Sequence, residues 1–144
     1  RSRGLGDVYK RQSWLYPISM GATTIWERWN SMLPNGMVNS NSMVSFNHYA
    51  YGAVADWMYG TAAGINADPE RPGFEHIIFR PVTDERLNFV RASIDTRRGT
   101  VKSEWRRENG GIRYIFTVPE GSTASVIIGE ETHDIGAGVH EIFE

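Results

Sequence analysis

The pattern of apolar and polar positions changes character near residue 70 of this 144-residue chain. After that point, apolar residues alternate with polar ones in short runs that are typical of half-buried strands. In chain order the runs are HIIFRP, LNFVRASIDT, GTVKSEWRR, GIRYIFTVP, TASVIIG and GVHEIF. Turn residues separate them, and Asn109-Gly110-Gly111 between two alternating runs is the strongest hairpin signal. This part of the pattern predicts an antiparallel β-sandwich.

The segment SFNHYAYGAVADWMYGTAAGI, residues 45–65, is apolar and aromatic almost throughout. We predict one helix here, with Ser45 as its N-cap and Gly64 as its C-terminal stop. Because neither face is strongly charged, the helix should be buried on both sides, as in a layered all-helical architecture. The stretch before it, residues 30–44, is polar and rich in turn residues, which predicts a loop that lies over a site.

The two parts meet in ADPERPGFEH, residues 67–76, whose two prolines and glycine mark a domain boundary. We therefore expect a helical part over residues 13–70 and a β-sandwich over residues 71–144. The first stretch, RSRGLGDVYKRQ, has neither helical nor strand periodicity and resembles translated adaptor sequence. We interpret residues 1–12 as a non-native leader, so that the natural sequence begins in mid-protein and the chain is the tail of a longer one.

Composition narrows the classes of function. Apolar residues make up 40% of the chain and charged residues 22%, which is typical of a globular protein. The net charge of -2, with dispersed basic residues, gives no electrostatic case for nucleic acid. No apolar run approaches the roughly 20 residues that a membrane span needs. There is no cysteine, and the four histidines lack metal-binding spacing, so no metal site is expected. The compartment stays open.

The stretch GATTIWERWNSM, residues 21–32, is the best candidate for chemistry. Burial of the Glu27 carboxylate between Trp26 and Trp29 would favour its protonated form and suit it to general acid or base catalysis. The alternative is that Glu27 pairs with Arg28 or another surface cation. The two tryptophans either stack on the apolar faces of sugar rings or pack in the core.

His48 and Asn47 fall in the first turn of the predicted helix. Each is either a ligand contact or a satisfied capping or core residue, whereas Trp57, further along the helix, is expected to pack in the core. Tryptophan, glutamate, asparagine and histidine gathered in one region are typical of a carbohydrate site.

Two segments, SWLYPISMGATTIWERWNSM and SFNHYAYGAVADWMYG, closely resemble the C-terminal part of bacterial α-L-rhamnosidases, glycoside hydrolase family 78. The resemblance extends from Ser13 to the end of the chain, because PGFEHIIFRP and the strand-rich tail also match. Gln12 stands where the family usually has Pro, which supports a foreign segment that ends near residue 12. Asn30 stands where Asp is common in the family.

The resemblance implies the last helices of an (α/α)6 barrel followed by a C-terminal, jelly-roll-like β-sandwich. It also implies an inverting glycosidase, without a cofactor, that releases terminal α-L-rhamnosyl residues from glycosides. Glu27 would then be the catalytic base and His48 a contact to the bound rhamnose. The residue pattern itself adds Trp26, Trp29 and Asn47 as candidates for the substrate site. The general acid lies upstream in the family, so the missing N-terminal portion of the same chain is the expected partner. With most barrel helices missing, aromatic faces would be exposed, and the fragment alone should be inactive and poorly soluble.

Two other functions remain open. The chain could belong to another (α/α)6-barrel glycosidase with a different sugar, because fold alone does not set specificity. Alternatively, the β-sandwich could be a carbohydrate-binding module without chemistry. The single tryptophan of the sandwich, Trp105, disfavours this second alternative because it provides no evident aromatic platform.

Overall fold

The computed structural model describes residues 13–40 and 43–144. It contains two compact units, Arg1–Val54 and Ala55–Glu144, each of which is described by itself below. The predicted leader, residues 1–12, lies outside the described residues. None of the helices in the described part of the chain is both long and apolar enough to cross a membrane.

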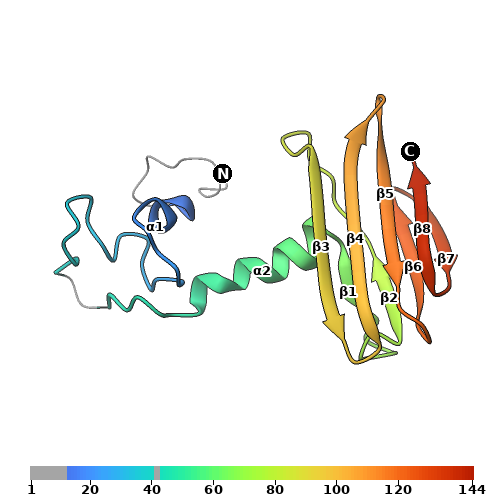
Figure 1. Cartoon of the computed structure of the whole chain (residues 1–144), viewed down its shortest axis with the longest axis horizontal. Helices are drawn as coiled ribbons and strands as arrows, with labels where there is room; N and C mark the ends of the chain where they lie inside the picture. Colours follow the sequence, from blue (N-terminus) through green and yellow to red (C-terminus); the bar gives the residue numbers. More distant parts are fainter. Residues whose placement is uncertain (1–12, 41–42) are drawn as a thin grey trace. The chain divides into compact units, whose positions relative to one another are not determined.

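The second unit contains a β-sandwich of two four-stranded sheets (Figure 1). The first sheet has the order β1 (Ile65–Ala67), β2 (His76–Phe79), β6 (Thr123–Ile128) and β7 (Glu131–Ile135). The second has the order β3 (Phe89–Thr96), β4 (Gly99–Glu108), β5 (Gly111–Val118) and β8 (Gly138–Phe143). The predicted sandwich is thus confirmed. One pair differs from the antiparallel prediction, because β2 and β6 run parallel.

Each of the six alternating runs forms a strand, namely β2, β3, β4, β5, β6 and β8. The predicted turn between β4 and β5 has positive φ angles at both Asn109 (51°) and Gly110 (81°), which is the backbone that Asn-Gly favours in tight hairpins. The sequence pattern missed β1 and β7. β1 has only three residues, and it pairs with β2 although it lies ahead of the predicted boundary at residue 70.

The core of the sandwich is formed by alternate residues of both sheets. Its largest fully buried hydrophobic side chains are Trp105, Phe79, Phe116, Ile77, Val101 and Val126. The indole N–H of Trp105 donates a hydrogen bond to the carbonyl oxygen of Ala62 at 2.8 Å. The hydroxyl of Ser103 donates to the carbonyl oxygen of Ala63 at 2.6 Å. Two residues of β4 therefore hold the segment that leads into the sandwich.

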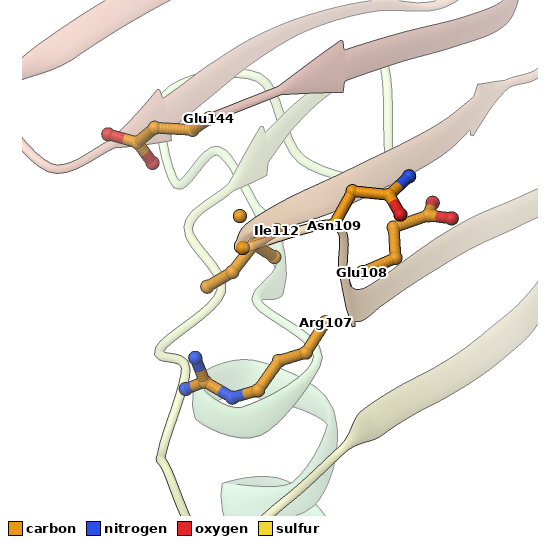
Figure 2. Close-up of a pocket in the computed structure, with 7 residues that line it drawn as sticks. Arg107, Glu108, Asn109, Ile112 and Glu144 are labelled. Atoms are coloured by element: carbon orange, nitrogen blue, oxygen red, sulfur yellow. The ribbon is translucent and has the colours of Figure 1, made fainter.

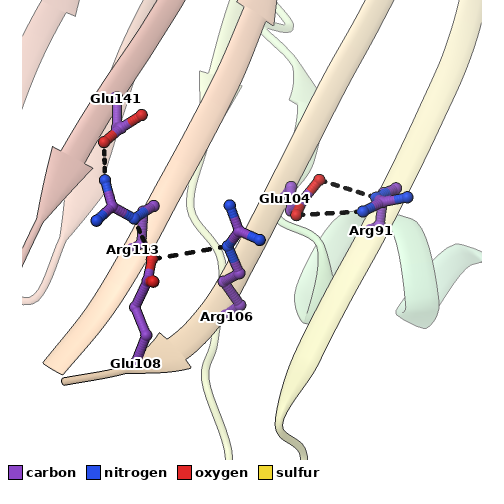
Figure 3. Close-up of polar contacts among 6 residues, drawn as sticks. All are labelled: Arg91, Glu104, Arg106, Glu108, Arg113 and Glu141. Carbon is purple, nitrogen blue, oxygen red and sulfur yellow. Dashed lines mark hydrogen bonds and ion pairs between the residues drawn. The ribbon is translucent and has the colours of Figure 1, made fainter. Parts of the chain in front are cut away.

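The outer face of the second sheet carries a ladder of ion pairs (Figure 3). Its members come from β3, β4, β5 and β8: Arg91, Glu104, Arg106, Glu108, Arg113 and Glu141. Arg91 and Glu104 are cross-strand partners 2.8 Å apart, and Arg113 bridges Glu108 and Glu141. Exposed pairs of this kind typically contribute about 0–1 kcal/mol each, so they support strand register more than stability.

A polar cluster lies on the first sheet, where sequence reasoning identified nothing. The buried His76 contacts the hydroxyl oxygens of Thr123 at 2.7 Å and Ser125 at 3.0 Å through its two ring nitrogens. The Ser125 hydroxyl in turn donates to Asp134 at 2.6 Å. These side-chain hydrogen bonds join β2, β6 and β7.

The predicted single helix over residues 45–65 is wrong at its start. Helical structure begins with the 3-10 helix η1 (Ala50–Ala53), continues as α2 (Val54–Trp57) and ends as the π-helix η2 (Met58–Ala62). Ser45 is therefore not an N-cap. Its hydroxyl bonds the backbone of Asn47 in a local turn, which competes with helix formation.

The prediction that this helix is buried on both sides is also wrong. Within the described residues, Trp57 is 47% exposed, and Met58 and Tyr59 are exposed beside it. The prediction that Trp57 packs in the core is corrected by the same observation. An apolar helix face is buried only where another element packs against it, and an aromatic sequence pattern does not guarantee such an element.

Gly64 follows the last helical turn with a φ angle of +73°, in agreement with its predicted role as the C-terminal stop. Its carbonyl oxygen accepts a hydrogen bond from the backbone N–H of Arg80 at 2.8 Å. A Cβ at this position would lie 2.1 Å from the backbone nitrogen of Pro81. Gly64 thus permits both the turn and the close approach of a second backbone segment.

Gly64→Ala should destabilise the chain far more than Gly73→Ala, the matched control. Both glycines have a φ angle of +73°, but a Cβ at Gly73 would meet no atom within 4 Å. The left-handed backbone costs either alanine about 1–2 kcal/mol, and the clash at Gly64 adds about 3 kcal/mol or more. Urea unfolding followed by circular dichroism measures both losses. Equal losses would show that the close approach to Pro81 is not needed.

The stability of the sandwich should fall at alkaline pH because of Tyr114. Burial, and secondarily the charge of Glu144, raises the pKa of the Tyr114 phenol. The unfolded chain releases this proton near pH 10, while the folded chain still holds it, so the free energy of unfolding decreases as pH rises through that range. We expect Tyr114→Phe to lessen this decrease in urea titrations between pH 9 and 11, and Tyr59→Phe, at an exposed position, to leave it unchanged.

Candidate functional site

The candidate site lies in the first unit, on two segments that are hydrogen bonded to each other. The backbone N–H of His48 donates to the carbonyl oxygen of Ile25 at 2.8 Å. The backbone N–H of Glu27 donates to the carbonyl oxygen of Ser45 at 2.9 Å. The two segments run antiparallel, since Ile25 pairs with His48 and Glu27 pairs with Ser45. These bonds bring together the WERW motif (residues 26–29) and the segment that carries the NHYA motif (residues 47–50).

The carboxylate of Glu27 is held by backbone. Its Oε2 accepts a hydrogen bond from the backbone N–H of Ser45 at 2.9 Å, and the side chain is partly buried. Among ion pairs formed between described residues, none involves Glu27. The alternative in which Glu27 pairs with Arg28 is therefore not the contact observed.

The tryptophans around Glu27 belong to two aromatic contacts. Trp26 is 5% exposed and packs edge-to-face against Phe46, with ring centroids 5.1 Å apart. Trp29 stacks on Tyr51 at 4.0 Å with an interplanar angle of 10°, and meets the edge of Trp14 at 4.6 Å. Trp26 therefore has little surface left for a ligand, while Trp29 is partly exposed with one face covered. Their contact with a sugar stays a prediction.

His48 lies ahead of the helix, not in its first turn as predicted. Its Nδ1 accepts a hydrogen bond from the backbone N–H of Ala50 at 3.3 Å, and its ring stacks beside Tyr49 at 5.6 Å. In the neutral imidazole this arrangement places the proton on Nε2, which can then donate to a ligand. Asn47 is exposed, and its backbone N–H donates to the Ser45 hydroxyl at 3.2 Å.

The predicted loop over residues 30–44 is confirmed in its described part. It includes an isolated antiparallel bridge between Met32 and Val38 around a turn at Gly36, whose φ is 81°. The side-chain amide of Asn39 donates to the backbone carbonyl of Asn30 at 3.2 Å, which joins the loop to the end of the WERW motif. That contact uses only the backbone of residue 30, so it does not depend on the side chain at this position.

Two further contacts fasten the loop, and neither was predicted. The buried Ser31 donates its hydroxyl to the carbonyl oxygen of Arg28 at 3.1 Å. Tyr16, in the short helix α1 (Leu15–Ser19), donates its hydroxyl to the carbonyl oxygen of Met32 at 2.8 Å. Serine and tyrosine at these positions carry no sequence signal of such roles, because both bonds go to backbone atoms.

A shallow pocket of about 560 Å³ lies in the second unit, at the turn between β4 and β5 (Figure 2). It is lined by Arg107, Glu108, Asn109, Gly110, Gly111, Ile112 and Glu144. In Figure 2 the side chains of Arg107 and Glu108 extend in different directions, so no set of polar groups converges on one point. The pocket contains none of the predicted site residues. Within residues 13–40 and 43–144, no three metal-ligating side chains form a group.

Comparisons with known proteins match both parts of the chain. Residues 8–62 match the family model described as the bacterial alpha-L-rhamnosidase 6 hairpin glycosidase domain. Residues 64–143 match the bacterial alpha-L-rhamnosidase C-terminal domain. An alpha-L-rhamnosidase of Streptomyces avermitilis is 40% identical over 131 residues, which cover 91% of this chain and 12% of that protein. One of Formosa agariphila is 40% identical over 116 residues, 81% of this chain and 12% of that protein.

Solved structures agree with these matches. The native rhamnosidase of Aspergillus terreus superposes with a TM-score of 0.86 at 36% identity, over 96% of this chain and 16% of that one. The Streptomyces avermitilis enzyme, solved in complex with L-rhamnose, gives a TM-score of 0.78 at 34% identity, over 94% of this chain and 15% of that one. The chain thus spans about 12% of the length of the relatives that it matches in sequence.

Proposed function

Because the chain belongs to the bacterial α-L-rhamnosidase family, we propose that the protein containing it hydrolyses terminal α-L-rhamnosyl residues from glycosides with inversion at the anomeric carbon. The observation that carries this proposal is the hydrogen-bonded pairing of the WERW and NHYA motifs, which puts Glu27 and His48 on adjoining segments. Since the chain spans about 12% of its relatives, the activity is proposed for the whole protein.

Glu27 acts as the general base in this proposal. With its Oε2 anchored by the Ser45 backbone, the Oε1 oxygen takes a proton from the water that attacks the anomeric carbon. A carboxylic acid in the remainder of the polypeptide protonates the leaving oxygen from the opposite side of the sugar. Inverting enzymes keep the two carboxyl groups about 6.5–9.5 Å apart, which leaves room for the water.

His48 and Asn47 hold the sugar. Since Nδ1 of His48 is already an acceptor for the Ala50 N–H, its Nε2–H is the group that donates to a rhamnose hydroxyl. The exposed side-chain amide of Asn47 can both donate to and accept from a second hydroxyl. The exposed part of Trp29 offers the apolar contact, while the more deeply buried Trp26 packs against Phe46 beside Glu27.

Replacing Glu27 by Gln in the full-length protein should lower kcat for p-nitrophenyl α-L-rhamnoside by about 10²–10⁴-fold, because an amide cannot accept the proton. The KM should change little, since Gln keeps the shape of the side chain and the Ser45 contact. Glu120→Gln, at an exposed turn of the sandwich, is the matched control. Full activity in the Glu27 variant would remove Glu27 from the chemistry, and inactivity of the unmodified enzyme would indicate another sugar.

The 144-residue chain alone should not turn over the same substrate. The proposal assigns the general acid to the remainder of the polypeptide, and without it the leaving oxygen departs as a poorly stabilised alkoxide. The assay compares equal molar amounts of the isolated chain and the full-length protein under identical conditions. Turnover by the purified chain would show that the acid lies within these residues.

A further inference from the structure

We infer that Ser45 is the positioning residue for Glu27: its backbone holds the carboxylate, and its hydroxyl holds that backbone in place. This inference rests on the proposed role of Glu27 as general base. Ser45 itself touches neither the sugar nor the water in this scheme. Its effect on catalysis passes through the orientation of the carboxylate and through the segment that carries His48.

The first observation is a reciprocal pair of hydrogen bonds. The Ser45 N–H donates to Oε2 of Glu27, and the Glu27 N–H donates to the Ser45 carbonyl oxygen, both at 2.9 Å. One residue therefore contacts both ends of the glutamate, its backbone and its carboxylate. This arrangement restricts the side-chain torsions of Glu27, so that Oε1 is presented in one direction. A base held in one direction avoids the entropy cost of being ordered at each turnover.

The second observation is a tight turn built on the Ser45 hydroxyl. Its oxygen lies 3.2 Å from the backbone nitrogen of Asn47, from which it accepts a hydrogen bond, and 3.2 Å from the Asn47 carbonyl oxygen, to which it donates. One residue later, the N–H of His48 donates to the Ile25 carbonyl oxygen. The hydroxyl thus fixes the spacing between the residue that holds the base and the residue that contacts the sugar.

A third contact extends the pairing between residues 24–27 and residues 45–48 beyond Ser45. The Thr24 hydroxyl donates to the carbonyl oxygen of Phe46, between the Ser45 and His48 contacts. Phe46 also packs against Trp26, directly ahead of Glu27. Ser45 is therefore one of several residues that join the two segments. Removal of its hydroxyl should loosen the geometry of the site without unfolding it.

The chemistry of the Ser45 amide suits a base. The bond occupies Oε2, which leaves Oε1 to accept the proton from water. Weakening this contact should lower kcat more than it raises KM, because proton transfer depends on the orientation of the carboxylate, whereas His48 is also held by its own bond to Ile25.

The test uses the full-length enzyme and three variants. Ser45→Ala removes the turn-forming hydroxyl, and Ser45→Thr restores it. Ser19→Ala is the matched control, because Ser19 also donates its hydroxyl to a nearby backbone carbonyl, that of Tyr16, at 2.8 Å. The readouts are kcat, KM and the melting temperature.

We expect Ser45→Ala to lower kcat about tenfold and to leave KM within about twofold. Ser45→Thr should restore most of kcat, and Ser19→Ala should match the unmodified enzyme. In a Glu27→Gln background, Ser45→Ala should cause no further loss, because the two residues act as a unit. Equal losses in Ser45→Ala and Ser45→Thr, or a further loss when Ser45→Ala is added to Glu27→Gln, would overturn the inference.

Failure of this inference is distinguishable from failure of the proposed function. If Glu27→Gln abolishes turnover while Ser45→Ala behaves like the unmodified enzyme, the base is correctly assigned and Ser45 does not position it. If Glu27→Gln retains turnover, the assignment of the base fails and the positioning role fails with it. A Ser45→Ala variant that loses activity only in proportion to a lower melting temperature would assign Ser45 to folding alone.

Discussion

The antiparallel pairing of the WERW and NHYA segments is the contact on which the candidate site depends. Backbone N–H and C=O groups must find partners, and those of Ser45, Phe46 and His48 find them on residues 24–27 instead of in a helix. This choice has two consequences. It delays the helix until Ala50, and it sets Glu27 beside the residues that precede the helix. A local alternative to helical hydrogen bonding thus creates the geometry on which the chemistry relies.

The second unit depends on a different constraint, which is the close approach of the incoming chain to the sandwich. Trp105 and Ser103 of β4 bind the carbonyl oxygens that end the helical segment, and Gly64 lets the chain pass against Pro81. Loss of either donor would leave a buried carbonyl group without a hydrogen bond and would lower the free energy of unfolding. Both side chains therefore hold the incoming chain as well as filling the core. The sandwich itself offers no convergent polar site in the pocket at the β4–β5 turn.

The proposed mechanism divides labour between backbone and side chains. The carboxylate that would activate water is oriented by a main-chain amide, and the histidine that would contact the sugar is oriented by another, that of Ala50. Such contacts leave few marks in a sequence, because any residue can supply a backbone N–H. The residues that carry out the chemistry are therefore visible as motifs, whereas most of those that position them are not.

The sequence by itself determined six of the eight strands of the sandwich, the Asn109-Gly110 hairpin and the stop at Gly64, because alternation and positive-φ turns act over a few residues. Its motifs also identified the family through Glu27 and His48. Only the tertiary structure decided that Ser45 turns the chain instead of capping a helix, that β2 pairs in parallel with β6, and that Trp57 is exposed. Each of these depends on which partner a backbone or an apolar face finds across long sequence separations, and local patterns do not encode that choice.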